Sequence, residues 1–174
     1  NVFISAKKSS VPNVFDVEAK VISAGIIGDN NLHLTGTINN NTSSPTLDLT
    51  ADMNDFDIAF AQEFVKGVFG NLRGKASGDL KISGELSDVD YSGDIAMKDM
   101  GLKLNFTGVD YSFEDTVISL SKGLAILNDI GVKDGRSNSR GSISGAIQFE
   151  TLSSMGVNLV MRADNLMLLN TTQK

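Results

Sequence analysis

The chain has 174 residues, enough for a domain that buries its own core, with 17 Gly but only 2 Pro and no Cys. The lack of cysteine excludes thiolate nucleophiles and cysteine-built zinc or iron–sulfur sites, and a single histidine, His33, argues against a His-rich metal site. A net charge of −6 argues against nucleic-acid binding. From these three features together we expect neither an enzyme nor a nucleic-acid-binding protein, and no cofactor.

Apolar and polar residues alternate along most of the chain, as in strands that bury one face. From Leu32 to Ile38, for example, even positions are apolar or glycine and odd positions are polar. The alternating segments, in chain order, are residues 2–6, 15–21, 32–38, 46–53, 72–86, 91–97, 102–106, 109–113, 118–120, 124–126, 143–149 and 157–163. Roughly ten to twelve strands with short polar turns fit this pattern, which predicts one all-β antiparallel domain over residues 1–174.

Residues 55–69 differ, because their apolar residues recur every three or four positions, which is the period of a helix. Asn54 is placed to cap the start of this helix and Gly70 to end it. Four of the nine Phe lie on it and need a covering surface: Phe56, Phe60, Phe64 and Phe69. We expect this short amphipathic helix to plug or cap one open end of the β structure.

A second role for the helix, as a mobile lid or a membrane-touching element, is also open. Its polar positions Asp55, Asp57 and Glu63 are acidic, and Lys66 is its one base. Anionic lipid surfaces prefer basic faces, so the charge of the helix favours the plug.

Glycine recurs inside the alternating segments, for example at Gly78, Gly84, Gly93, Gly141 and Gly145. A glycine inside a strand sacrifices side-chain packing, and it suits sharp curvature or the close approach of another backbone. The repeated glycines therefore predict a strongly curved sheet.

No catalytic motif stands out. The run from Gly141 to Gly145 has Ile143 where a nucleophilic serine would stand, and His33 falls on the polar side of its strand, as a surface residue does.

The apolar face is therefore the candidate functional feature. It is either the dry core of a closed barrel or sandwich, or an open groove that accepts acyl chains, and both produce the same alternation. The candidate lining residues are Leu32, Leu34, Ile38, Leu47, Leu49, Leu80, Ile82, Ile95, Met97, Leu102, Leu104, Phe106, Ile118, Leu120, Ile143, Ile147, Phe149, Val157, Leu159 and Met161.

Several segments of the C-terminal half, taken together, resemble a known family. They are GDIAM (93–97), VDYSF (109–113), TVISL (116–120), ILND (126–129), RGSISGAI (140–147) and LVMRADNLMLLNTT (159–172). In this order they resemble the C-terminal region of TamB, the translocation and assembly module, in its Bacteroidetes-like version. The resemblance covers residues 72–174, with residues 163–172 the most diagnostic part, whereas the first seventy residues share only the strand pattern.

This resemblance implies a long curved β-sheet folded like a taco shell around an apolar groove. It also implies a periplasmic location in an inner-membrane-anchored protein, and a TamA-like outer-membrane partner of the BamA superfamily. In such proteins the groove is thought to carry phospholipids across the periplasm or to shelter strands during outer-membrane protein assembly. Because the chain begins with Asn rather than Met, we also expect it to be a piece of a longer protein.

Three hypotheses follow. The first is a groove that accommodates phospholipid acyl chains. The second is a chaperone-like module, without lipid transport, whose exposed strand edge pairs with an incoming β-strand or with the outer-membrane partner. The third is a structural segment that has no ligand of its own.

Overall fold

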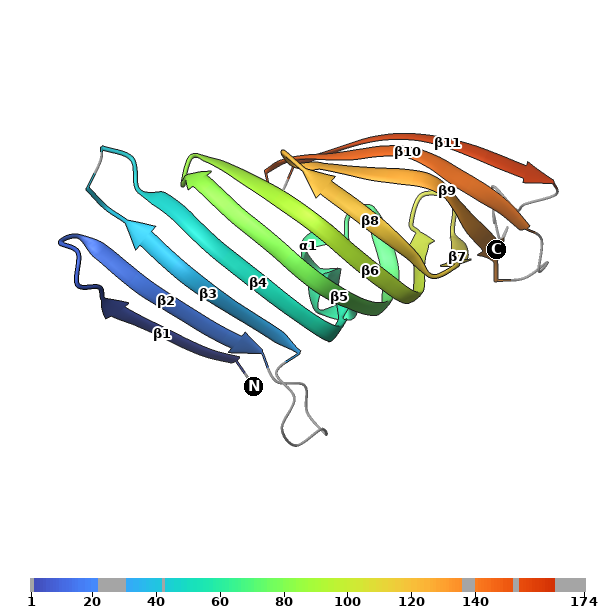
Figure 1. Cartoon of the computed structure of the whole chain (residues 1–174). Coiled ribbons are helices and arrows are strands. Elements are labelled where there is room, and N and C mark those ends of the chain that lie inside the picture. Colours follow the sequence, from blue (N-terminus) through green and yellow to red (C-terminus); the bar gives the residue numbers. More distant parts are fainter. Residues whose placement is uncertain (1, 22–30, 42, 136–139, 152–153, 165–174) are drawn as a thin grey trace. The chain divides into compact units, whose positions relative to one another are not determined.

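The computed structural model describes the chain except for residues 1, 22–30, 42, 136–139, 152–153 and 165–174. Side chains are also left undescribed at some strand and helix positions, among them the predicted site residues Phe64, Phe149, Val157, Leu159 and Met161. The described chain is an all-β protein built on an 11-stranded sheet (Figure 1), which confirms the predicted fold class.

The strands are β1 (Val2–Lys8), β2 (Val14–Val21), β3 (Leu32–Asn39), β4 (Thr46–Asp57), β5 (Phe69–Glu85), β6 (Asp88–Leu104), β7 (Val109–Phe113), β8 (Thr116–Ser121), β9 (Leu124–Asp134), β10 (Arg140–Thr151) and β11 (Ser154–Asp164). Strands β1 to β6 follow one another in the sheet in chain order, and β9, β10 and β11 do the same. Strands β7 and β8 both pair with β6 and with β9, so they fill one position in the sheet in succession.

The chain divides into two compact units, and strands β4, β5, β6 and β8 contribute residues to both. Unit 1 comprises residues 1–56, 77–95 and 120–123, and unit 2 comprises residues 57–76, 96–119 and 124–174. The predicted single groove over residues 1–174 concerns the two units together, and it stays a prediction.

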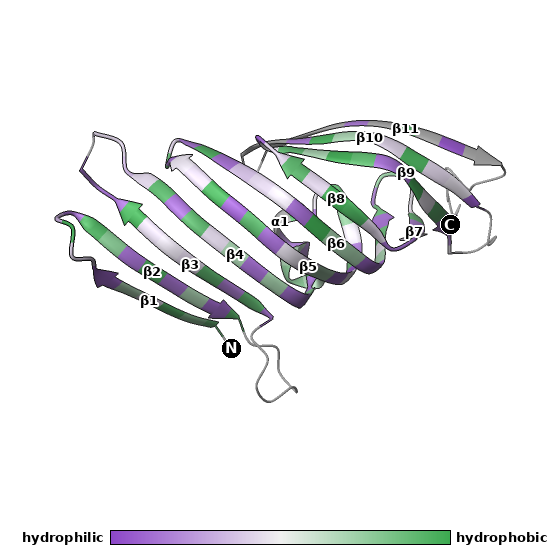
Figure 2. Cartoon of the chain, viewed as in Figure 1, coloured by the Kyte–Doolittle hydropathy of each residue, from purple (hydrophilic) through white to green (hydrophobic). Residues whose placement is uncertain are grey.

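Unit 1 carries a continuous apolar face across four strands. In the antiparallel register, Ile4 of β1 lies opposite Ala19 of β2, Ala19 opposite Leu34 of β3, and Leu34 opposite Ala51 of β4. Residues directly opposite one another in a sheet share a face, so these four side chains form one row. Figure 2 shows the matching alternation of hydrophobic and hydrophilic residues along these strands.

The core of unit 2 is a cluster of buried side chains from β7, β9 and β10. Its members are Val109, Tyr111, Leu127, Ile130, Val132 and Ile143. Tyr111 and Val132 are the largest of the fully buried side chains in the described chain.

The predicted helix is present but shorter than expected. A 3₁₀ turn, η1 (Ile58–Ala61), leads into a single α-helical turn, α1 (Gln62–Val65). Strand β4 extends to Asp57 and β5 begins at Phe69, so residues 55–57 and 69 belong to strands. Asp57 rather than Asn54 is the cap, because its carboxylate accepts a hydrogen bond from Ala59 N at 3.0 Å.

Among the described residues, four strands contain an Asp or Asn with a left-handed backbone. These are Asp55 in β4 (φ 47°), Asn71 in β5 (50°), Asp99 in β6 (50°) and Asp129 in β9 (48°). At Asp129 the pairing of β9 with β10 shifts register, as at a β-bulge, and Asp129 N donates to Ser144 Oγ at 3.0 Å. Asp and Asn tolerate this conformation better than other residues that carry a side chain.

Each of these residues is the third residue of the same four-residue pattern. The pattern begins and ends with an apolar residue, its second position varies, and its third is Asp or Asn. The four segments are Met53–Phe56, Phe69–Leu72, Met97–Met100 and Leu127–Ile130. A bulge adds one residue to a strand and shifts its alternation by one position, so both apolar ends of such a segment can face the interior. In β9, for example, Leu127 and Ile130 are both buried.

Glycines also shape the sheet, most clearly where Gly78 of β5 and Gly93 of β6 adopt φ values of 135° and 155°. A Cβ atom on Gly78 would collide with the carbonyl oxygen of Asp94, and one on Gly93 with that of Asp79. These two glycines permit a close backbone approach between β5 and β6, as the sequence predicts for in-strand glycine.

Candidate functional site

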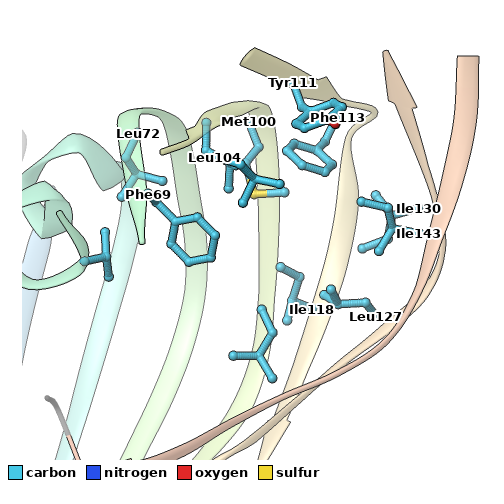
Figure 3. A pocket seen from close by; sticks show the side chains of 13 residues that line it. Phe69, Leu72, Met100, Leu104, Tyr111, Phe113, Ile118, Leu127, Ile130 and Ile143 are labelled. Carbon is cyan, nitrogen blue, oxygen red and sulfur yellow. The ribbon is translucent and has the colours of Figure 1, made fainter. Parts of the chain in front are cut away.

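The main candidate site is an apolar cavity of about 230 Å³ within unit 2, and no polar atom reaches its surface. Its lining residues are Val65, Phe69, Leu72, Met100, Leu102, Leu104, Tyr111, Phe113, Ile118, Leu127, Ile130, Ile143 and Ile147. Figure 3 shows these side chains converging from several strands on one space. This lining can hold hydrocarbon.

The wall of the cavity is assembled from six elements of the sheet and from α1. Helix α1 supplies Val65 and β8 supplies Ile118, whereas β5, β6, β7, β9 and β10 each supply two or three residues. The left-handed residues Asn71, Asp99 and Asp129 lie in β5, β6 and β9, three of the strands that form the wall.

One part of the wall is deeply buried and another is partly exposed. Tyr111, Leu127, Ile130 and Ile143 belong to the buried cluster. Leu104, Phe113, Ile118 and Ile147 pack against that cluster but are only partly buried. The cavity is therefore a recess that extends the core of unit 2 toward solvent.

The side chain of Gln62 fastens α1 to the wall. Gln62 Nε2 donates to the carbonyl oxygen of Phe69 at 2.9 Å, and Leu72 N donates to Gln62 Oε1 at 2.7 Å. Both partners line the cavity. The helical turn thus closes part of the cavity by presenting Val65.

Arg73 joins three neighbouring strands next to the cavity. Starting from β5, its guanidinium lies over Gly101 of β6, where a Cβ atom would overlap it. Its Nη2 reaches β7, at 2.7 Å from Asp110 Oδ1 and 3.1 Å from Ser112 Oγ. Asn71 Nδ2 also donates to Asp110 Oδ2, at 2.6 Å. These contacts hold the strands that carry the cavity wall.

Tyr111 has the one ionisable side chain of the lining. It is 2% exposed, and its register partner on β9, Asp134, is 4% exposed. Burial, and secondarily the charge of Asp134, raises the pKa of the Tyr111 phenol above its ordinary value of 10.0. The cavity is therefore uncharged at neutral pH.

Six of the predicted site residues meet in the cavity: Phe69, Leu102, Leu104, Ile118, Ile143 and Ile147. Met97 is buried in unit 2 but does not line it. Phe106 lies in the turn after β6 and is 81% exposed, so the alternation that included it ends at Leu104. Phe60 is also exposed, and Phe56 is half-buried in unit 1.

Nine more predicted lining residues belong to unit 1 and are buried or half-buried there. They are Leu32, Leu34, Ile38, Leu47, Leu49, Leu80, Ile82, Ile95 and Leu120. The side chains of Phe64, Phe149, Val157, Leu159 and Met161 lie outside the described part of the structure.

Seven lining residues were missed by sequence reasoning: Val65, Leu72, Met100, Tyr111, Phe113, Leu127 and Ile130. In β9 the predicted inward pair was Leu124 and Ile126, but Ala125 and Leu127 are buried and Ile126 is exposed. The repeated segment with Asp or Asn in its third position was the available signal for Leu72, Met100, Leu127 and Ile130.

Two other kinds of site have no support in the part of the chain that the structure describes. It contains no group of three or more His, Cys, Asp or Glu side chains placed to hold a metal ion. Within that same part, none of the helices combines the length and the apolar character needed to cross a membrane.

Comparison with known proteins gives one family. The family model described as TamB C-terminal domain matches residues 20–124, more than half of the chain. The match begins further toward the N-terminus than the predicted resemblance over residues 72–174, and residues 163–172 lie outside it. No curated protein and no solved structure matches this chain.

Proposed function

The chain belongs to the TamB C-terminal domain family, and from this premise we propose that its apolar interior holds the acyl chains of phospholipids. The observation that supports this proposal most is the cavity of unit 2, with thirteen apolar or aromatic side chains and no polar atom on its surface. Acyl chains rest on such a wall while their headgroups stay in water. The mechanism is passive, with no catalytic residue and no cofactor.

The apolar row of unit 1 supports the same proposal. Leu34 is half-buried and Ile4 is 77% exposed, so this row is not a closed, dry core. At about 25 cal/mol per Å², a few hundred Å² of acyl surface transferred from water to such a face contributes on the order of several kcal/mol. A face that continues from strand to strand offers a chain similar sites along its length.

We place this activity in the periplasm, in a protein anchored in the inner membrane that works with a TamA-like outer-membrane protein of the BamA superfamily. There it would move phospholipid between the two membranes and support the assembly of outer-membrane proteins. The family membership supports this setting in general terms.

The test fills the cavity without adding charge. Leu104→Trp places a larger side chain in the recess, and Leu86→Trp makes the same change at an exposed turn position of unit 1. We expect delipidated Leu104→Trp protein to bind a long-chain fatty acid at least about tenfold more weakly in native mass spectrometry, because the lost apolar contact exceeds 1.4 kcal/mol. Leu86→Trp protein should bind like the parent chain.

Failure of the parent chain to bind fatty acid, or equal binding by both variants, would contradict the proposal. Circular dichroism and thermal unfolding must show that both variants are folded. Leu104→Arg is a harsher second variant, and its binding should be compared only at equal foldedness, because a charge in an apolar cavity also destabilises the fold.

A second candidate function rests on the edge of the sheet. In the part of the chain that the structure describes, strand β1 pairs with β2 alone, and its Val2, Phe3 and Ile4 are 56%, 56% and 77% exposed. An open edge of this kind can accept a further strand from a client or partner. Proline at Phe3, which lies outside the apolar row of unit 1, separates the two functions. Proline removes a backbone donor from the edge strand, so it should block strand pairing and leave fatty-acid binding intact.

A further inference from the structure

Two turns of unit 2 are joined into one rim. Residues 66–68 connect α1 to β5, and residues 105–108 connect β6 to β7. Asn105 N donates to the carbonyl oxygen of Val68 at 3.1 Å, and Asn105 Nδ2 donates to that of Lys66 at 2.8 Å. These two hydrogen bonds fix the turns side by side.

The rim adjoins the wall of the apolar cavity along the chain. Val68 stands in the chain between Val65 and Phe69, which both line the cavity. Phe106 follows the lining residue Leu104 by two positions. The rim therefore leads directly from the cavity wall to the surface of unit 2, although neither Val68 nor Phe106 lines the cavity.

The rim exposes large apolar side chains to solvent. Phe106 is 81% exposed, the highest value among the exposed large hydrophobic residues of the described chain, and Val68 is 43% exposed. Apolar groups of this size that gather at the edge of a recess mark sites of interaction with lipid or protein.

The local charge suits a phospholipid surface better than the charge of the whole chain does. The net charge of the chain is −6, yet residues 100–109 contain Lys103 and no acidic residue. Glu63 is paired with Lys66 at 2.8 Å. Asp57, one of the acidic residues that argued against membrane contact, lies in β4 and is bonded to Lys75 at 3.2 Å.

We propose that this rim docks on the surface of a phospholipid bilayer, with Phe106 and Val68 inserted among the acyl chains and Lys66 and Lys103 near the headgroups. A rim with two inserting side chains is far smaller than the roughly 1,000 Å² that a specific protein interface buries, whereas a fluid bilayer accepts a small apolar insertion. The inference rests on the proposed function, since it makes the rim the point where acyl chains pass between bilayer and cavity.

The experiment measures flotation of the 174-residue chain with vesicles of phosphatidylethanolamine and phosphatidylglycerol. The test variant is Val68→Ser with Phe106→Ser, and the matched control is Phe3→Ser, which removes a 56% exposed Phe from β1. We expect the test variant to partition roughly tenfold or more weakly into vesicles, and the control to float like the parent chain. Both variants change exposed positions, so thermal unfolding should stay close to that of the parent chain.

A fatty-acid binding assay without vesicles separates docking from the cavity itself. The Val68→Ser, Phe106→Ser protein should bind fatty acid as the parent chain does, and Leu104→Trp protein should float but bind poorly. If the parent chain floats with vesicles in a way that depends on Val68 and Phe106 but binds no fatty acid, the result supports docking and overturns only the cavity proposal.

Three results would overturn the docking proposal. They are a parent chain that does not float, a test variant that floats equally well, and a Phe3→Ser control that loses as much binding as the test variant. A lipid-free dimer that Phe106→Ser dissociates would assign the rim to a second copy of the chain, and that result would overturn it too.

Discussion

Glu18 illustrates how single residues on the polar face of unit 1 interact across strands. Its Oε1 lies 2.7 Å from Lys20 Nζ and accepts a hydrogen bond from His33 Nε2 at 3.0 Å. Lys20 first and His33 second hold the pKa of this carboxyl below its ordinary value of 4.5. His33 is thus a partly exposed partner in a polar pair, in keeping with its prediction as a surface residue.

The pKa of Glu18 should therefore depend on Lys20 more than on His33. Because the folded-state pKa is lowered, this carboxylate stabilises the fold above its unfolded-state pKa, and that contribution is lost as the pH falls through the folded value. Carboxyl-carbon NMR titration should show a pKa below 4.5, a clear rise in Lys20→Met and a smaller rise in His33→Gln. An unchanged pKa in Lys20→Met would contradict the assignment of its cause.

Tyr111 should titrate late. Its phenol is buried beside Asp134, so deprotonation is disfavoured in the folded state and its pKa exceeds 10.0. In Tyr91→Phe protein, where Tyr111 is the only tyrosine, tyrosinate absorbance should have its midpoint above pH 10.

The stability of the fold should follow the same ionisation. Because the folded-state pKa is raised, the neutral phenol contributes its full stabilisation of the fold below pH 10. This stabilisation is lost as the pH rises through the folded-state pKa. Asp134→Asn should lower the midpoint only in part, because burial is the larger cause. A midpoint at or below 10 in Tyr91→Phe protein would show that Tyr111 is not held in a buried environment.

At the level of single strands, the bulge at Asp129 decides which side chains of β9 reach the interior. Asp129 has a left-handed backbone, so Asp129→Val should destabilise the fold by about 1–2 kcal/mol, the cost of that conformation for a residue with a bulky side chain. Asp129→Gly is the matched control and should be close to neutral, because glycine adopts this conformation freely.

Urea unfolding measures both changes. If Asp129→Val and Asp129→Gly lost the same stability, the backbone conformation would not be the cause. Ser144→Ala tests the other half of the bulge, because it leaves Asp129 N without the oxygen that accepts its hydrogen bond at 3.0 Å. Its expected cost is about 0.5–1.5 kcal/mol.

The bulges also explain how much of the strand structure sequence alone could predict. Alternation was sufficient for the all-β class and for strands such as β3, where Leu32, Leu34 and Ile38 keep one parity. The alternation failed in β9, where it predicted that Leu124 and Ile126 face the interior. That prediction takes no account of the extra residue at Asp129. Periodicity assumes an uninterrupted strand, and a bulge interrupts it without any apolar residue being lost.

The helix was overextended for a related reason. The apolar residues between 54 and 70 fit a helical period, but Phe56 lies near the end of β4 and Phe69 begins β5. Two strand ends and the short helical turn between them therefore produced the spacing of one longer helix. Tertiary pairing of the strands overrides such a local pattern.

Across the whole molecule, local stability should differ between strands. Strand β1 is an edge strand with mostly exposed side chains, whereas Val132 of β9 is 1% exposed and belongs to the core cluster of unit 2. Amides of Val2–Lys8 should therefore exchange hydrogen faster than those of Ile130–Asp134 by several orders of magnitude.

Hydrogen-exchange mass spectrometry on the full chain provides this comparison. Equal protection of β1 and β9 would contradict the expected order and would indicate that the edge of β1 is covered in solution. Repeating the measurement with phospholipid vesicles adds a check on the rim, where residues 105–108 should gain protection while Thr116–Ser121 of β8 should change little.

The absence of polar atoms from the cavity surface has a consequence for selectivity. A wall without hydrogen-bond donors or acceptors cannot distinguish one headgroup from another, since such discrimination depends on polar groups left unpaired by the wrong ligand. Such a wall can discriminate between hydrocarbon chains of different length, because one methylene changes the binding free energy by about 1–3 kcal/mol at most. Unit 2 should therefore sort its occupants by chain length and shape, and be indifferent to the chemical class of the lipid that carries the chain.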